Sequence, residues 1–132
     1  MIGLKIMKNS KKKIIYSEFI GSCFLVMIVV GSGIMAQNLT TDVAIMLLAN
    51  TIATGAGLFV LITVFSDISG AHFNPFVTLS MYFTGRLKSK LIHIYILSQI
   101  LGCLAGVGLA NFFFYLSIFE LSYNTRDGVY IF

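Results

Sequence analysis

The chain is poor in charge, proline, cysteine and tryptophan. Of its 132 residues only 11% are charged, one is proline, two are cysteine and none is tryptophan. Hydrophobic residues make up 58% of the chain, and the mean hydropathy is +0.93. So apolar a composition excludes a soluble domain of this size and is typical of a membrane protein.

The sequence also lacks the residue groups that metal binding and catalysis require. Cys23 and Cys103 fall inside apolar segments without a paired spacing, so we interpret them as small core residues. His72 and His93 are distant in sequence and predict no metal cluster. Because no paired carboxylates or nucleophile–base set is found, we expect neither an enzyme nor a cofactor.

Three segments are long and apolar enough to cross a bilayer, which takes about 20 residues. They cover residues 14–36, 43–66 and 91–118, and the one residue among them with a formal charge is Glu18. Residues 119–132 are mixed polar and aromatic and too short for a fourth span. The sequence therefore predicts an all-α protein of the lipid bilayer with three transmembrane helices.

Positive charge is concentrated next to these spans. Residues 1–13 contain five lysines, and Arg86, Lys88 and Lys90 lie between the second and third spans. By the positive-inside rule both segments are cytoplasmic, which places the loop 37–42 and the tail 119–132 outside a multi-pass protein of the cell membrane. The apolar run after the lysines is too long for a cleaved signal peptide. A lysine cluster beside a span is explained by its role in orienting the protein in the membrane, so nucleic-acid binding is not expected.

Glu18 is the anomaly of the first span. An ionisable side chain within a span is costly and indicates a functional site that faces the interior of the bundle. Alternatively, Glu18 lies close enough to the cytoplasmic end to be solvated or to pair with a lysine.

A helix start is predicted inside the membrane, in the segment 67–85 between the second and third spans. Asn74 is a good N-cap, Pro75 suits the first helical position, and Gly70 lets the backbone turn before them. A helix that begins in hydrocarbon leaves its first N–H groups unsatisfied unless it lines a water-filled cavity. The segment therefore favours a pore or a buried polar site.

The run Ser-Gly-Ala-His-Phe-Asn-Pro at 69–75 resembles the first half-helix signature of the aquaporin and glycerol-facilitator family. Two further patterns resemble that family in the same order along the chain: Glu-Phe-Ile-Gly at 18–21, and Tyr-x-x-x-Gln-x-x-Gly at 95–102. In the third span, Gly102 and Gly106 also form a face for close helix packing. The resemblance covers most of the chain, from Glu18 to about Gly106.

The resemblance implies one half of the inverted-repeat aquaporin-like fold, three spans plus a reentrant half-helix. Glu18 and Gln99 would support the pore loop, and Thr54 would stand where many water-selective members carry a large aromatic residue. The residues implied to line the pore are Thr54, Ser69, Gly70, Ala71, His72, Phe73, Asn74, Pro75 and Phe76. For His72 a role as a hydrogen-bonded loop histidine is equally open.

The resemblance implies passive transport of water or small neutral solutes such as glycerol. Family members contain a second Asn-Pro half-helix followed by a pore-facing arginine, and neither is found in these 132 residues. We therefore expect that conduction requires a second half, from a separate chain or a homo-oligomer. Phe76 departs from the small residue that the family has at this position, so a truncated, non-conducting remnant or assembly partner is the alternative.

Overall fold

The computed structural model describes residues 11–118; the predicted tail at 119–132 and most of the basic N-terminus lie outside the described residues. The described chain forms four helices: α1 (Lys11–Leu39), α2 (Val43–Ser69), α3 (Pro75–Phe83) and α4 (Ser89–Phe113). Helices α1, α2 and α4 are long and apolar enough to cross a membrane. The predicted fold class, three spans and one short helix, is confirmed.

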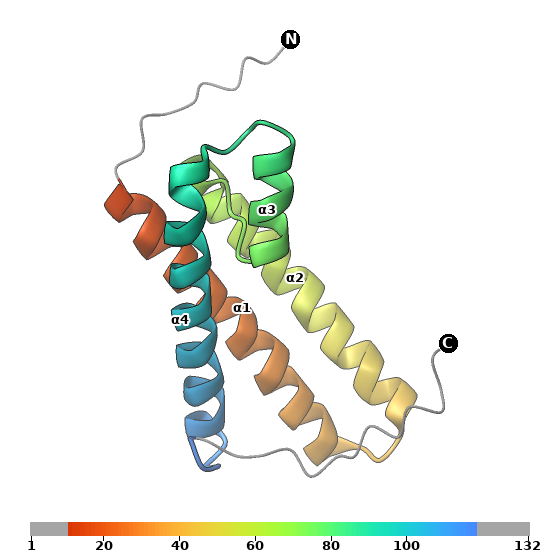
Figure 1. The fold of residues 1–132 in the computed structure, drawn as a ribbon. Helices are drawn as coiled ribbons and strands as arrows, with labels where there is room; N and C mark the ends of the chain where they lie inside the picture. The colour runs from red at the N-terminus through yellow and green to blue at the C-terminus, as the bar shows by residue number, and fades with distance from the viewer. Residues whose placement is uncertain (1–10, 119–132) are drawn as a thin grey trace, which may run out of the picture.

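The short helix α3 lies within the bundle rather than beyond it. Helix α1 packs against both α2 and α4, and α3 packs against α4 (Figure 1). After α2 the chain turns back along the bundle and then reverses into α3, which returns to the end where α1 begins (Figure 1). With nine residues α3 is about 14 Å long, roughly half of a hydrocarbon core of about 30 Å.

The residues at the ends of α2 and α4 explain why these two helices end elsewhere than the sequence predicts. Residues 67–69 were expected in the reentrant segment but belong to α2, because the left-handed residue that ends this helix is Gly70, with φ 89°. Helix α4 ends at Phe113 instead of near 118. Tyr115 takes a left-handed φ of 57° there, and the amide of Leu116 donates to the carbonyl of Asn111.

Glycine allows α1 and α4 to approach at backbone contact, as the sequence predicts. A Cβ atom on Gly102 would collide with the carbonyl oxygen of Phe19, and one on Gly106 with the carbonyl oxygen of Cys23. At the other interface, the side-chain amide of Asn50 on α2 donates to the carbonyl of Val29 at 2.7 Å. Close packing and interhelical hydrogen bonds are the interactions that hold helices together in lipid.

We expect Gly106→Ala to destabilise the bundle by about 1–3 kcal/mol, because α1 and α4 must separate to admit the methyl group. Gly55→Ala is the matched control: a Cβ on Gly55 meets nothing within 4 Å, and alanine favours a helix over glycine by about 1 kcal/mol. Unfolding by titration with a denaturing detergent, followed by circular dichroism, measures both changes. Equal stability of the two variants would contradict the close contact.

Candidate functional site

The loop between α2 and α3 has a strained backbone. Gly70, Ala71 and Phe73 all have positive φ angles, of 89°, 50° and 49°. A left-handed conformation costs a residue with a side chain about 1–2 kcal/mol. Two such residues within three positions persist only where the surroundings hold them, so the partners of this loop identify the site.

The Glu18 carboxylate holds the loop. One of its oxygens, Oε1, accepts hydrogen bonds from the Ser69 hydroxyl at 2.5 Å and from the His72 amide at 3.1 Å. The other, Oε2, accepts from the Phe73 amide at 2.8 Å and from the Gln99 side-chain amide at 2.8 Å. Glu18 is 0% exposed, so the alternative of a solvated carboxylate is wrong. Four donors compensate for the loss of water around a buried charge.

Ser69 connects the carboxylate to α1 and α4. Its hydroxyl donates to Glu18 and accepts from the Ala71 amide at 3.1 Å and from the Ser17 hydroxyl at 3.0 Å. Its carbonyl oxygen accepts from the Tyr95 hydroxyl at 2.5 Å. The turn that starts the loop is therefore fixed from both neighbouring long helices.

Thr78 on α3 is a second junction of the network. Its hydroxyl donates to the Asn74 carbonyl at 3.2 Å and accepts from the Gln99 amide at 3.0 Å. The same oxygen lies 3.1 Å from Nδ1 of His72, whose ring stacks on Tyr95 with centroids 4.6 Å apart. Because the Thr78 proton points to Asn74, we infer that Nδ1 of His72 carries a proton and donates it.

The Phe73 side chain anchors the loop in the apolar core. It belongs to a buried cluster with Leu61 and Ala71, and its ring meets that of Phe65 edge to face at 5.9 Å. A Cβ on Gly21 would collide with the Phe73 ring, so glycine at that position leaves the space that the ring occupies. Burial of a phenyl ring offsets part of the backbone strain.

The backbone amides of the loop have hydrogen-bond partners within the described chain, whereas its backbone carbonyl groups do not. The amides of Ala71, His72 and Phe73 are all bonded inward, to Ser69 or Glu18. The carbonyl groups of residues 70–73, by contrast, accept no hydrogen bond from any residue between 11 and 118. At the start of α3, the side-chain carbonyl oxygen of Asn74 accepts a hydrogen bond from the Phe76 amide at 2.8 Å. The side-chain NH₂ group of Asn74 donates to no described residue.

The structure places the predicted pore residues in three environments. The side chains of Ser69, Ala71, His72 and Phe73 are buried, so only their backbone remains as a candidate lining. Residues Gly70, Asn74, Pro75 and Phe76 are exposed, and Phe76 is 76% exposed at the start of α3. Thr54 lies 15 residues before Ser69 on α2, about 22 Å along that helix, with its hydroxyl buried and unpaired within the described chain.

Sequence reasoning missed two members of the network. Thr78 lies within the predicted segment 67–85 and follows the N-cap Asn74 by one helical turn, but it was not among the predicted site residues. Ser17 precedes Glu18 in the first span, and its hydroxyl was not considered. The sequence does contain a signal for both residues. Each has a polar side chain close to a motif residue, one helical turn away for Thr78 and one residue away for Ser17.

Comparison with known proteins agrees with this architecture. A sequence model of the Major intrinsic protein family matches residues 5–128. Aquaglyceroporin AqpS of Rhizobium meliloti is 47% identical over 112 residues, which are 85% of this chain and 48% of the relative. Aquaporin A of Dictyostelium discoideum is 37% identical over 94 residues, 71% of this chain and 34% of the relative. The chain thus spans half or less of the length of these relatives.

We expect Glu18→Ala to lower the free energy of unfolding in detergent by about 3 kcal/mol or more, because it leaves several buried donors unpaired. Ser22→Ala is the matched control one turn further along α1. Ser22 is also 0% exposed, but its hydroxyl has no partner within the described residues, so its removal should leave stability unchanged or slightly raised. Equal stability of the two variants would show that Glu18 does not hold the loop.

Proposed function

The chain belongs to the Major intrinsic protein family, and from this premise we propose that it is one half of a membrane channel for water or small neutral solutes such as glycerol. The named relatives, an aquaglyceroporin and an aquaporin, support this class of cargo. The proposed route runs along the loop 70–74 and the start of α3.

One observation carries the proposal: four consecutive carbonyl groups, at residues 70–73, without a partner among the described residues. Backbone carbonyls inside a membrane protein need a hydrogen-bond donor, and water or a solute hydroxyl supplies one. The Asn74 NH₂ group, also without a described partner, offers a donor at the end of this row. A molecule with both donor and acceptor groups, such as water or glycerol, suits such a row.

The start of α3 adds selectivity against cations. The amide groups of a helix N-terminus carry about half a positive charge, and this end lies at the tip of the reentrant segment. A positive helix end within a narrow polar route repels cations while neutral molecules pass. Neutral solutes are therefore the proposed cargo.

Completion of the route requires a second half. Asn74, Pro75 and Phe76 are exposed at the tip of α3, and a helix end facing hydrocarbon leaves its dipole and amides unsatisfied. We propose that a second half of the family fold, or another copy of this chain, covers this tip. The relatives' greater length supports the first of these two partners.

The Phe76 side chain favours a second candidate function, a non-conducting assembly partner. A phenyl ring 76% exposed at the tip stands where the resemblance implies a small residue that lets two half-helices touch. Overpacking of such a contact costs about 1–3 kcal/mol, enough to displace the tips.

We expect reporter fusions to place Met1 and Arg86 in the cytoplasm and Tyr123 outside, since the basic residues flank α1 and α4 at one end of the bundle. Met1 and Tyr123 lie outside the described residues, so the fusions test the sequence prediction directly. Reporter activity that puts Met1 and Tyr123 on the same side would overturn the three-span topology.

Expressed alone in lipid vesicles, the 132-residue chain should give little water or glycerol flux above the background of empty vesicles. Co-expression with the C-terminal half of Aquaglyceroporin AqpS should restore flux, because the second half covers the exposed tip. Stopped-flow light scattering measures both rates. Rapid swelling from this chain alone would mean that it completes a pore by itself.

The restored channel also decides between the two candidate functions. Phe76→Ala should raise its rate if the ring narrows the route, whereas Phe83→Ala, an equal change at the exposed far end of α3, should leave the rate unchanged. Absence of flux from the wild-type and Phe76→Ala pairs, both assembled in the membrane, would favour the assembly partner.

A further inference from the structure

Phe76 is an uncovered phenyl ring at the tip of α3. It is the second residue of this helix, directly after Pro75, and it is 76% exposed. Its ring contacts no other aromatic ring among residues 11–118. Asn74 and Pro75 beside it are exposed as well. Because side chains in a packed contact leave little spare volume, so large a group at the tip determines which surface can pack against it.

The chain itself shows what a phenyl ring needs at a close helix contact. Three residues before Phe76, the Phe73 ring packs onto α1 at Gly21, where an added Cβ atom would collide with the ring. Even alanine at position 21 would therefore displace it. The contact is close because a residue without a side chain lies opposite the large one. We expect the same complement opposite Phe76.

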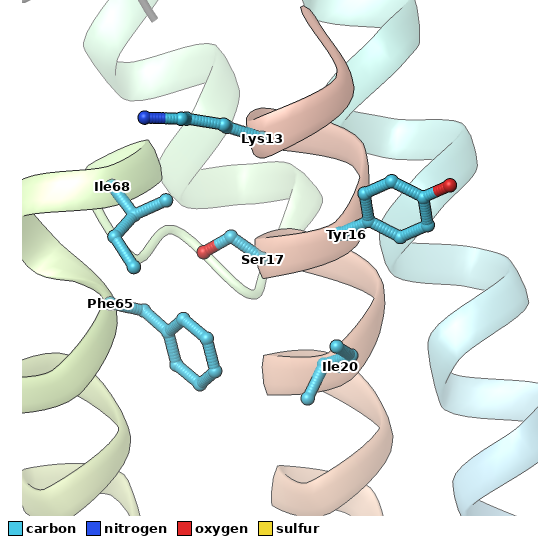
Figure 2. Close-up of a pocket in the computed structure, with 6 residues that line it drawn as sticks. All are labelled: Lys13, Tyr16, Ser17, Ile20, Phe65 and Ile68. Atoms are coloured by element: carbon cyan, nitrogen blue, oxygen red, sulfur yellow. The ribbon is translucent and has the colours of Figure 1, made fainter. Parts of the chain in front are cut away.

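A second copy of the chain does not offer this complement, because all copies insert in the same orientation. Figure 2 shows Lys13 near the start of α1, extending toward the end of α2 that carries Ile68. The opposite end of the bundle has one charged residue within the described chain, the acidic Asp42. By the positive-inside rule the basic end faces the cytoplasm in every copy, so two α3 tips enter the membrane from the same side and cannot meet head to head. The exposed basic residues at this end are Lys11, Lys12, Lys13, Arg86, Lys88 and Lys90.

A copy inserted upside down would also be a poor partner. In a two-fold contact a residue near the axis meets its own equivalent, so Phe76 would face a second Phe76. The centroids of paired aromatic rings stay about 4.5–7 Å apart. Two rings between the tips would hold the two backbones too far apart for the tip-to-tip contact that the proposed function requires.

We propose that Phe76 selects the partner of this tip: its ring fills the space that a glycine leaves at the tip of the partner's half-helix, so the tip accepts a matched second half and excludes a second copy of this chain. The inference rests on the proposed function, since it specifies the partner at the same tip. One large and one absent side chain replace two small ones, and such volume-conserving exchanges are the ones that a packed contact tolerates best.

Co-purification from membranes tests the inference without measuring transport. The tagged 132-residue chain is co-expressed with the C-terminal half of Aquaglyceroporin AqpS, with glycine, alanine or phenylalanine after Asn-Pro in the second half-helix expected of this family. The wild-type chain should retain the glycine form best and the phenylalanine form at least about tenfold less, because overpacking destabilises a tight contact. Phe76→Ala should reverse this order, since the space then lies on the tip of this chain.

Phe83→Ala is the matched control, because Phe83 is equally exposed at the far end of α3; this variant should keep the wild-type order. Equal retention of the three forms by the wild-type chain would place the ring outside the contact and overturn the inference, while the proposed channel half would stand. Two differently tagged copies of the chain that co-purify as well as the glycine pair would overturn it too. Retention of none of the forms would overturn the proposed second half itself. The expected order without flux would contradict conduction alone.

Discussion

The Glu18 carboxylate accepts hydrogen bonds from four donors that come from α2, the reentrant loop and α4. A fully buried charge is among the most costly groups in an apolar bundle, and only a complete set of donors makes it tolerable. The loop in turn has two strained residues, Ala71 and Phe73, that need fixed partners. The donors of the loop compensate the buried charge, and the carboxylate holds the strained loop residues in place. Neither the buried charge nor the loop conformation is therefore stable without the other.

The same hydrogen bonds give the loop its polarity. Because Glu18 and Ser69 take the amide groups, the carbonyl groups of residues 70–73 remain unpaired within the described chain. A regular helix through this depth would pair every amide with a carbonyl and leave no acceptor row. The reentrant conformation is thus what allows backbone atoms, rather than side chains, to serve the proposed transport.

The sequence predicts the features that local chemistry determines. A charge within an apolar span identifies Glu18, and the cap preferences of Asn74 and Pro75 locate the start of α3. The sequence does not predict the partners of Glu18, because they lie 51 to 81 residues away and depend on how three helices pack. The end of α4 was also misplaced. Tyr115 adopts a left-handed conformation that is rare for a tyrosine, so composition gave no sign of it.

The donor set of Glu18 also fixes an order of events during synthesis. Glu18 enters the membrane with α1, but its last donor, Gln99, belongs to α4 and is made 81 residues later. At a synthesis rate of about 5–20 residues per second, at least about 4 seconds pass before the carboxylate has all four of its hydrogen-bond donors. During this interval the carboxylate lacks the hydrogen bond from Gln99, so the full support of the reentrant segment forms only after α4 has packed. Biogenesis of this bundle must therefore keep a partly solvated carboxylate within reach of water, or of the insertion machinery, until the third span arrives.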